Sequence, residues 1–365
     1  MNRSKETDER HLRQCLALAF RGNGFVSPNP MVGCIIVKDG RIVGKGYQKS
    51  FGGPHAETEA LRKAGGQARG ATLYVNLEPC TRRGKTPHCV DAIISNGIKR
   101  VVACSADPNP LASSRGARKL RRAGIRVDLG LLRTESERLN ERFFAFVRTR
   151  LPFVGLKIAQ TIDGKVADTR GRSKWITSKH ARKEVHRLRS EYDAILVGAN
   201  TIALANPQLT VRNVKGRNPL RVVFDPTLRL KPSAAVFNTW KAGTLVFTSA
   251  RAMSARKSVV AKMSRQGVYM LGLDKAKPFD LLVVLKTLAA LGVSSVLVEG
   301  GPFTAGEFLK RECVNKVHVF VAHKILGGGI NSITMKPSPS LASPIALHDV
   351  TCRSLGPGYL IEGSL

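Results

Sequence analysis

The sequence lacks a long apolar run, an aromatic-rich basic strand and any low-complexity segment. No apolar run reaches the roughly 18 residues that a membrane-spanning helix needs, so we expect no membrane association. Phe, Trp and Tyr make up only 6% of the chain, and no basic strand is rich in them, as RNA-binding sheets are. Because repeats are absent too, we expect ordinary globular domains.

The cysteines do not form a disulfide pattern. They number seven and are spread over positions 15, 34, 80, 89, 104, 313 and 352. The first ten residues are charged, and no apolar segment of the signal-peptide kind follows them. We therefore expect a cytoplasmic protein with reduced cysteines, some of which bind a metal.

Acidic residues are scarce: 26 Asp and Glu stand against 59 Lys and Arg, for a formal net charge of +33. Such a charge first suggests a nucleic-acid partner. The excess is spread along the chain, however, with 28 Lys and Arg against 13 Asp and Glu in residues 1–150 and 31 against 13 in residues 151–365. An anionic small substrate or a generally basic proteome explains it equally well, and we do not expect nucleic-acid binding as the main function.

The length of 365 residues suits two domains, which we place at 1–150 and 151–365 with the boundary at Leu151-Pro152. In the first, helices are expected at 8–21, 55–64, 89–96 and 114–123 and strands at 34–37, 42–47, 71–76, 100–104 and 125–128, followed by an amphipathic stretch at 134–150. Asp39-Gly40 predicts a hairpin turn. In the second, strands are expected at 153–159, 194–197, 220–224, 245–247 and 296–298, with helices at 178–190 and 279–291. This alternation predicts an α/β fold for both domains.

Three potential zinc ligands occur in a characteristic order in the first domain. A catalytic zinc ion needs three ligands from His, Cys or carboxylate and one open position for water, and His55, Cys80 and Cys89 supply them. Cys89 opens a helix, whose N-terminus favours a thiolate. Glu57, two residues after His55, can move protons at this position without binding the metal. Together these residues match the His-x-Glu and Pro-Cys pattern of zinc nucleobase deaminases.

A structural zinc ion is the alternative, since a fourth ligand would close the site. His88 is next to Cys89 and could be that ligand. Two adjacent residues rarely both point at one metal, and we expect His88 to lie in the pocket or on the surface.

Nearly the whole chain resembles the bifunctional deaminase-reductases of riboflavin biosynthesis. Eight residues separate the two cysteines, where common cytidine and adenosine deaminases have two. The resemblance rests on these blocks: Ser27-Pro28-Asn29-Pro30, Val32-Gly33, Pro54-His55-Ala56-Glu57, Gly84-Lys85-Thr86-Pro87, Asp107-Pro108-Asn109-Pro110, Lys157, Asp163-Gly164, Ser173, Trp175-Ile176-Thr177-Ser178, Arg189, Thr201, Leu209, Arg212 and Glu299-Gly300-Gly301-Pro302. It implies a cytidine-deaminase-like α/β/α domain followed by a dihydrofolate-reductase-like α/β domain.

The resemblance implies that the first domain deaminates 2,5-diamino-6-ribosylamino-4(3H)-pyrimidinone 5′-phosphate to the corresponding uracil. Water activated on Zn²⁺ attacks the amino-bearing ring carbon, Glu57 takes and returns the proton, and ammonia leaves. Asn29 then contacts the pyrimidine and Lys85 the phosphate.

The same resemblance implies that the second domain reduces the ribosyl group to the ribityl chain with NADPH. The implied substrate residues are Ser173, Arg189, Leu209, Arg212 and Glu299, with Arg189 and Arg212 at the phosphate. The implied cofactor residues are Ala159, Trp175, Thr201, Ala205, Gly301, Pro302, Phe303, Thr304, Ala305 and Gly306. A glycine pair between a strand and a helix lets backbone amides approach a phosphate. As partners we expect this small-molecule substrate and further copies of the chain in a homo-oligomer.

The chain departs from the family's pattern in four places, two in each domain. Gln48 and Arg82 stand where the family has His in the deaminase domain. In the reductase domain Ala205-Asn206-Pro207 replaces an Asp-Asp-Pro run, and Gln160 replaces a small or apolar residue. The alternatives are therefore a changed deaminase substrate or a monofunctional deaminase with an impaired reductase domain; a nucleic-acid deaminase is less favoured.

Overall fold

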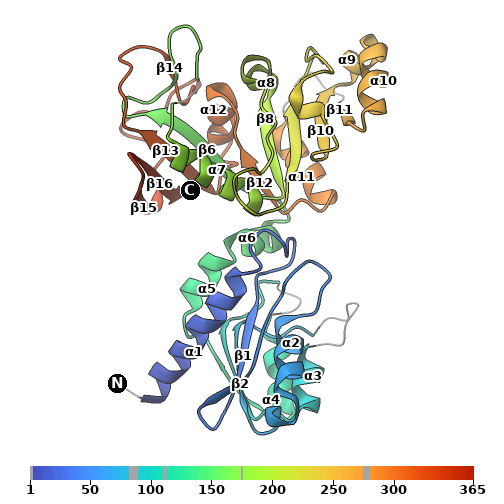
Figure 1. The fold of residues 1–365 in the computed structure, drawn as a ribbon, viewed down its shortest axis with the longest axis vertical. Helices are drawn as coiled ribbons and strands as arrows, with labels where there is room; N and C mark the ends of the chain where they lie inside the picture. The colour runs from blue at the N-terminus through green and yellow to red at the C-terminus, as the bar shows by residue number, and fades with distance from the viewer. Residues whose placement is uncertain (1–2, 82–88, 110–112, 174–175, 274–279) are drawn as a thin grey trace. The chain divides into compact units, whose positions relative to one another are not determined.

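The computed structural model describes residues 3–81, 89–109, 113–173, 176–273 and 280–365. The chain divides into two compact units, Met1–Arg150 and Leu151–Leu365 (Figure 1). Each unit has its own sheet and its own hydrophobic core. Within the described residues, no helix combines the length and the apolar character needed to cross a membrane.

A five-stranded sheet in the order β2-β1-β3-β4-β5 organises the first unit. β1 pairs antiparallel with β2 and β3, and β3, β4 and β5 run parallel. The predicted turn between β1 and β2 is confirmed, with Asp39 and Gly40 both left-handed at φ 49° and 75°, as a two-residue hairpin favours. The strands are β1 (Gly33–Lys38), β2 (Arg41–Tyr47), β3 (Thr72–Leu77), β4 (Arg100–Ser105) and β5 (Arg126–Leu129).

Helices cover both faces of this sheet (Figure 1). One face packs against α2 (Ala56–Ala64), α3 (Cys89–Ser95) and α4 (Arg115–Arg122), through side chains such as Leu61, Ile93 and Leu120. The other face packs against α1 (Arg3–Phe20), which contributes Leu12 and Cys15. The predicted amphipathic stretch at 134–150 is two helices, α5 (Arg133–Leu139) and α6 (Glu141–Thr149), and a short η1 (Gly65–Ala68) follows α2.

A nine-stranded sheet in the order β11-β10-β9-β8-β12-β6-β13-β16-β15 organises the second unit. The strands from β11 to β13 are parallel, whereas β16 pairs antiparallel with β13 and β15. β7 and β14 form a separate pair. The strands are β6 (Phe153–Thr161), β7 (Lys165–Ala167), β8 (Ala194–Gly198), β9 (Leu220–Phe224), β10 (Thr244–Ser249), β11 (Tyr269–Leu273), β12 (Ser295–Val298), β13 (Lys316–Ala322), β14 (Ile330–Asn331), β15 (His348–Leu355) and β16 (Gly358–Ser364).

Helices also flank this second sheet. The helices are α7 (Lys179–Glu191), α8 (Ala199–Ala205), η2 (Ala235–Phe237), α9 (Ala250–Ala255), α10 (Lys257–Arg265), α11 (Leu281–Ala290) and α12 (Pro302–Lys310). α11 and α12 supply Leu285 and Phe308 to the core. The five strands and two helices predicted for this unit are present, and the remaining elements are additional to the prediction.

A buried carboxylate joins the amino ends of two neighbouring strands. Asp193 immediately precedes β8, and its Oδ2 accepts hydrogen bonds from the backbone N–H groups of Ser294 and Ser295 at 2.9 and 3.1 Å. The hydroxyls of the same two serines donate to it at 2.6 and 3.2 Å. Asp193 therefore fixes the start of β12 relative to β8.

Replacing Asp193 with alanine is expected to destabilise the second unit by about 3 kcal/mol, because several buried donors lose their acceptor. Urea unfolding of the full chain, followed by circular dichroism, measures this loss. An unfolding free energy within about 0.5 kcal/mol of wild type, the range of an ordinary surface substitution, would show that these hydrogen bonds contribute little.

Candidate functional site

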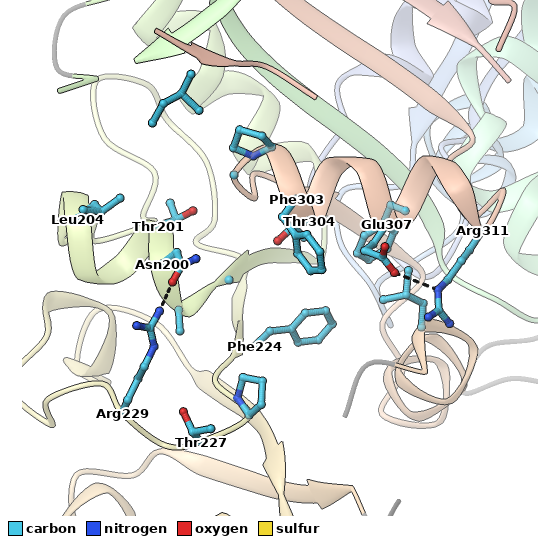
Figure 2. A pocket seen from close by; sticks show the side chains of 18 residues that line it. Asn200, Thr201, Leu204, Phe224, Thr227, Arg229, Phe303, Thr304, Glu307 and Arg311 are labelled. Atoms are coloured by element: carbon cyan, nitrogen blue, oxygen red, sulfur yellow. Dashed lines mark hydrogen bonds and ion pairs between the residues drawn. The ribbon is translucent and has the colours of Figure 1, made fainter. Parts of the chain in front are cut away.

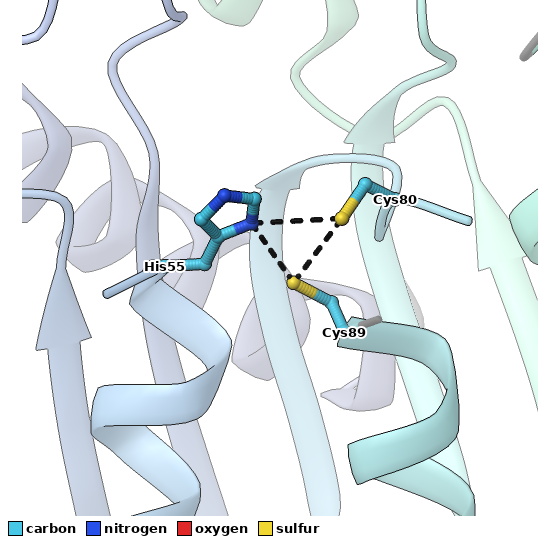
Figure 3. A group of neighbouring side chains, drawn as sticks. All are labelled: His55, Cys80 and Cys89. Carbon is cyan, nitrogen blue, oxygen red and sulfur yellow. Dashed lines mark hydrogen bonds between the residues drawn. The ribbon is translucent and has the colours of Figure 1, made fainter. Parts of the chain in front are cut away.

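Three segments of the first unit bring His55, Cys80 and Cys89 together (Figure 3). His55 is the N-cap of α2, Cys80 follows the end of β3, and Cys89 begins α3. The Nδ1 atom of His55 lies 3.1 Å from the sulfur of Cys89 and 3.5 Å from that of Cys80, and the two sulfurs are 3.4 Å apart.

This donor set fits a zinc ion. Ligand atoms bound at about 2.0–2.3 Å to one tetrahedral zinc lie about 3.5–3.8 Å from one another, close to the spacing here. One nitrogen and two sulfurs are ligands that zinc prefers, and three protein ligands leave its fourth position for water. The hydrogen bond with Cys89 lowers the pKa of the Cys80 thiol to about 4, with His55 adding to the effect, and raises that of Cys89.

Glu57 lies in the first turn of α2 and is buried, with 4% of its surface exposed. Burial and, to a smaller extent, the neighbouring Cys80 raise the pKa of its carboxyl group to about 7. A group with a pKa near the ambient pH both accepts and returns protons efficiently. The environment of Glu57 thus suits the proton transfer predicted for it.

Glu78 anchors the loop that carries Cys80. Its buried carboxylate accepts hydrogen bonds from the backbone N–H groups of Asp107, Ser114 and Ala117 at 3.1, 2.9 and 2.9 Å. These donors include the start of α4, where the helix dipole favours a negative charge. This function of Glu78 was not predicted, although an acidic residue directly before Pro79-Cys80 was a visible signal in the sequence.

Two buried amides anchor the loop that carries Asn29. Asn76 of β3 accepts from the N–H of Gly33 at 2.8 Å and donates to the carbonyl of Met31 at 3.0 Å. Asn140, between α5 and α6, bonds both main-chain groups of Met31, at 2.8 and 3.0 Å. The Asn29 loop is thereby fixed beside β3, the strand that leads to Cys80. Lys85, Arg82 and His88 lie outside the described residues.

The second unit contains a cavity of about 590 Å³ beyond the carboxyl ends of β8 and β9 (Figure 2). The N-terminus of α12 faces this cavity through Gly301 and Pro302. A helix N-terminus at the carboxyl edge of a parallel sheet is a favourable site for a phosphate. The size, the apolar wall at Phe224 and Phe303, and this helix end fit a dinucleotide such as NADPH.

Five of the predicted cofactor residues line this cavity: Thr201, Gly301, Pro302, Phe303 and Thr304. Ala305 and Gly306 are buried further along α12, Ala159 is half-buried in β6, and Ala205 is exposed at the end of α8. Trp175 lies outside the described residues. Asn200, Arg229 and Arg311 also line the cavity but were not predicted, since nothing adjacent in the sequence marks them.

The predicted substrate residues include a buried ion pair. Arg189 of α7 donates two hydrogen bonds to Glu299, at 2.7 and 2.8 Å, and Lys157 lies 3.9 Å from the same carboxylate. Burial alone raises the pKa of Glu299, but Arg189 and Lys157 lower it to about 2. Glu299 is therefore ionised at neutral pH and occupies much of the donor capacity of Arg189.

The other predicted substrate residues follow in two loops. Leu209 is buried with a left-handed φ of 52°, and Arg212 donates to Gln208 and Thr210 at 3.1 and 2.9 Å. Ser173 is exposed. Burial, together with Arg189 and Arg212, lowers the pKa of the nearby His186 to about 4. His186 is therefore neutral at pH 7.

Asn206, one of the residues that departs from the family pattern, ends α8. It has a left-handed φ of 41°, which Asn tolerates better than most residues, and its side-chain oxygen accepts from the N–H of Ala235 at 2.8 Å. Asn206 therefore joins the end of α8 to the segment that begins at Ala235.

Comparison with known proteins identifies both units. A family model described as the RibD C-terminal domain matches residues 152–361, and one described as the cytidine and deoxycytidylate deaminase zinc-binding region matches residues 5–105. The riboflavin biosynthesis protein RibD of Aquifex aeolicus is 47% identical over 328 residues, or 90% of each chain. The chain belongs to the RibD family. RibD of Escherichia coli is 38% identical and covers 97% of this chain, with 98% of its own length matched.

Solved structures agree with this assignment. The Thermotoga maritima diaminohydroxyphosphoribosylaminopyrimidine deaminase/5-amino-6-(5-phosphoribosylamino)uracil reductase has a TM-score of 0.88 and 39% identity, with 99% of each chain covered. RibD of Acinetobacter baumannii has a TM-score of 0.88 and 32% identity over the same shares.

These findings confirm the predicted family and fold class. The chain is a bifunctional enzyme of riboflavin biosynthesis, a hydrolytic deaminase and a reductase, with Zn²⁺ and NADPH as cofactors. The comparisons do not favour a monofunctional deaminase with an impaired second unit.

Two substitutions separate metal binding from proton transfer. We expect Cys89→Ser to lose both zinc and deamination, because it removes a thiolate ligand, and Glu57→Gln to keep zinc and lose deamination. Metal analysis and ammonia release measure the two effects, with exposed Cys352→Ser as control. Full zinc content in the Cys89 variant would show that another residue completes the site.

Proposed function

We propose that this chain deaminates 2,5-diamino-6-ribosylamino-4(3H)-pyrimidinone 5′-phosphate and then reduces the resulting ribosylaminouracil to its ribityl form. The observation that carries the proposal is the His55, Cys80 and Cys89 cluster, with ligand atoms within 4.8 Å and the buried Glu57 beside it. The Thermotoga maritima relative, similar over 99% of the chain, is named for the same two steps, which supports the proposal.

In the deaminase site, a bound zinc ion supplies a Lewis acid that lowers the pKa of water. His55, Cys80 and Cys89 hold the ion, and Glu78 keeps the Cys80 loop in place. Glu57 removes a proton from the attacking water and delivers it to the departing amine. Asn29 orients the pyrimidine, and Lys85 binds the phosphate.

In the reductase site, NADPH supplies the hydride for C1′ of the ribose. Ser173, Leu209 and Glu299 shape the substrate side, and Arg212 with Arg189 provides positive charge for the phosphate. Thr201 and Thr304 offer hydroxyls to the cofactor across the cavity, and the α12 N-terminus binds its pyrophosphate. Ala159, Trp175, Ala205, Ala305 and Gly306 complete the proposed cofactor site.

We further infer which domain carries each activity, where the enzyme acts and whether it assembles. Residues 1–150 form the deaminase domain and residues 151–365 the reductase domain. The enzyme acts in the cytoplasm as a homo-oligomer and does not use nucleic acid as its substrate, since its basic charge is spread over both units.

A product assay with and without NADPH tests the two steps. The purified full chain should convert the diamino substrate to the ribosylaminouracil alone without NADPH, and to the ribitylaminouracil with it. Accumulation of the ribosylaminouracil in both reactions would refute the proposed reductase step, and no conversion in either would refute the deaminase step.

Arg229 is expected to select NADPH over NADH. Its guanidinium lines the cavity and hydrogen-bonds to the neutral Asn200, whereas Arg311 is paired with Glu307 at 3.5 Å (Figure 2). A cationic side chain near the adenosine end favours the 2′-phosphate. We therefore expect Arg229→Gln to raise the KM for NADPH about tenfold or more and to leave that for NADH nearly unchanged.

Kinetics with both cofactors measure this change in preference. Arg251→Gln, at an exposed position of α9, is the matched control. An equal rise in both KM values would show that Arg229 supports the cavity without recognising the 2′-phosphate.

A further inference from the structure

Gln48 is buried but its side chain is not satisfied. Only 3% of the residue is exposed, and its Nε2 atom has no hydrogen-bond partner among the described residues. A buried amide without a partner is costly, so each such group in a native protein calls for an explanation. A bound ligand is one such explanation.

The packing of β2 indicates toward which face this side chain is directed. A Cβ atom on Gly44 would lie 2.3 Å from the carbonyl oxygen of Ala60, and one on Gly46 would lie 2.2 Å from that of Ala56. Both positions therefore face α2. The step from Gly44 to Gly46 along the strand matches the step from Ala60 back to Ala56 along the helix, because two strand residues rise about as far as four helical residues. Each step along β2 moves toward the N-terminus of α2.

Gln48 is the next position in this alternation. Its backbone N–H donates to the carbonyl of Val32 at 3.0 Å, which continues the pairing of β2 beyond Tyr47. Side chains alternate between faces in such a segment, so that of Gln48 points to the same face as Gly46. The next step places it at the N-terminal end of α2, where His55 and Glu57 lie.

The main chain of Gln48 is also joined to the loop that carries Asn29. Val32 is the acceptor of its N–H, and the adjacent Met31 and Gly33 are fixed by Asn76. The main chain of Gln48 thus lies beside the Asn29 loop, and the alternation along β2 directs its amide toward the helix that presents His55 and Glu57. These are the two walls of the proposed deaminase site.

We propose that Gln48 binds the pyrimidinone in the deaminase site, with its Nε2 donating to the ring carbonyl oxygen. This inference rests on the proposed deaminase function. A neutral, buried donor suits a neutral acceptor, whereas the phosphate is better matched by Lys and Arg. The ring carbonyl persists through deamination, so the contact strengthens binding of substrate and product alike.

Such uniform binding changes KM more than kcat. In the full-length zinc enzyme, Gln48→Leu should raise the KM for the diamino substrate about tenfold or more, with kcat within about threefold of wild type. The inhibition constant of the ribosylaminouracil product in the deaminase assay should rise by a similar factor. Gln67→Leu, at an exposed position of η1, is the matched control.

Three further measurements separate binding from folding. The zinc content of Gln48→Leu and its NADPH-dependent reduction of supplied ribosylaminouracil should equal those of wild type, and Gln48→Glu, which lacks the amide donor, should also raise KM. An unchanged KM for Gln48→Leu would overturn the proposal, and a higher melting temperature of this variant would then show that the amide is only an unsatisfied core group. Failure of the wild-type enzyme to deaminate would instead refute the proposed function.

Discussion

The deaminase site depends on holding three ligand atoms from separate segments within about 3.5 Å of one another, as one zinc ion requires. None of these segments is regular structure at the ligand itself except at the start of α3. Buried hydrogen bonds therefore do the positioning. Glu78 ties the Cys80 loop to α4, while Asn76 and Asn140 tie the Asn29 loop to the sheet.

The second unit forms its cavity at the carboxyl edge of a parallel sheet. Parallel strands end at one edge, and the backbone N–H groups of a following helix are directed there. The cavity at β8, β9 and α12 lies at this edge, and we propose that it binds the large anionic cofactor. Beside it, the Arg189 and Glu299 pair shows how a buried charge is retained, since each group is hydrogen-bonded by the other.

Much of this could be predicted from the sequence because the signals were local. The hairpin at Asp39-Gly40, the helix that opens at His55 and the zinc ligands all depend on residues close in the chain or on a spacing typical of one chemistry. The elements beyond α12 were not predicted, since β15 is exposed and has no clear alternation of polar and apolar residues. Arg229 could not be predicted for another reason: its environment is formed by segments distant in sequence. Gln48 stood out in the sequence only as a departure from the family's pattern, and its unsatisfied amide depends on the fold. The departure at Asn206 suggested an impaired reductase. Family membership does not favour that alternative, and the hydrogen bond from Ala235 shows that Asn206 has a structural role at the end of α8.

Each unit has its own core, and the division of the chain at Arg150 and Leu151 has a metabolic consequence. Two catalysts on one polypeptide are always synthesised in equal numbers, whatever the level of expression. A cell that makes this protein cannot adjust one step independently of its successor by changing transcription. Any imbalance between the steps must therefore arise from zinc supply, from the ratio of reduced to oxidised NADP, or from the turnover rate of each site.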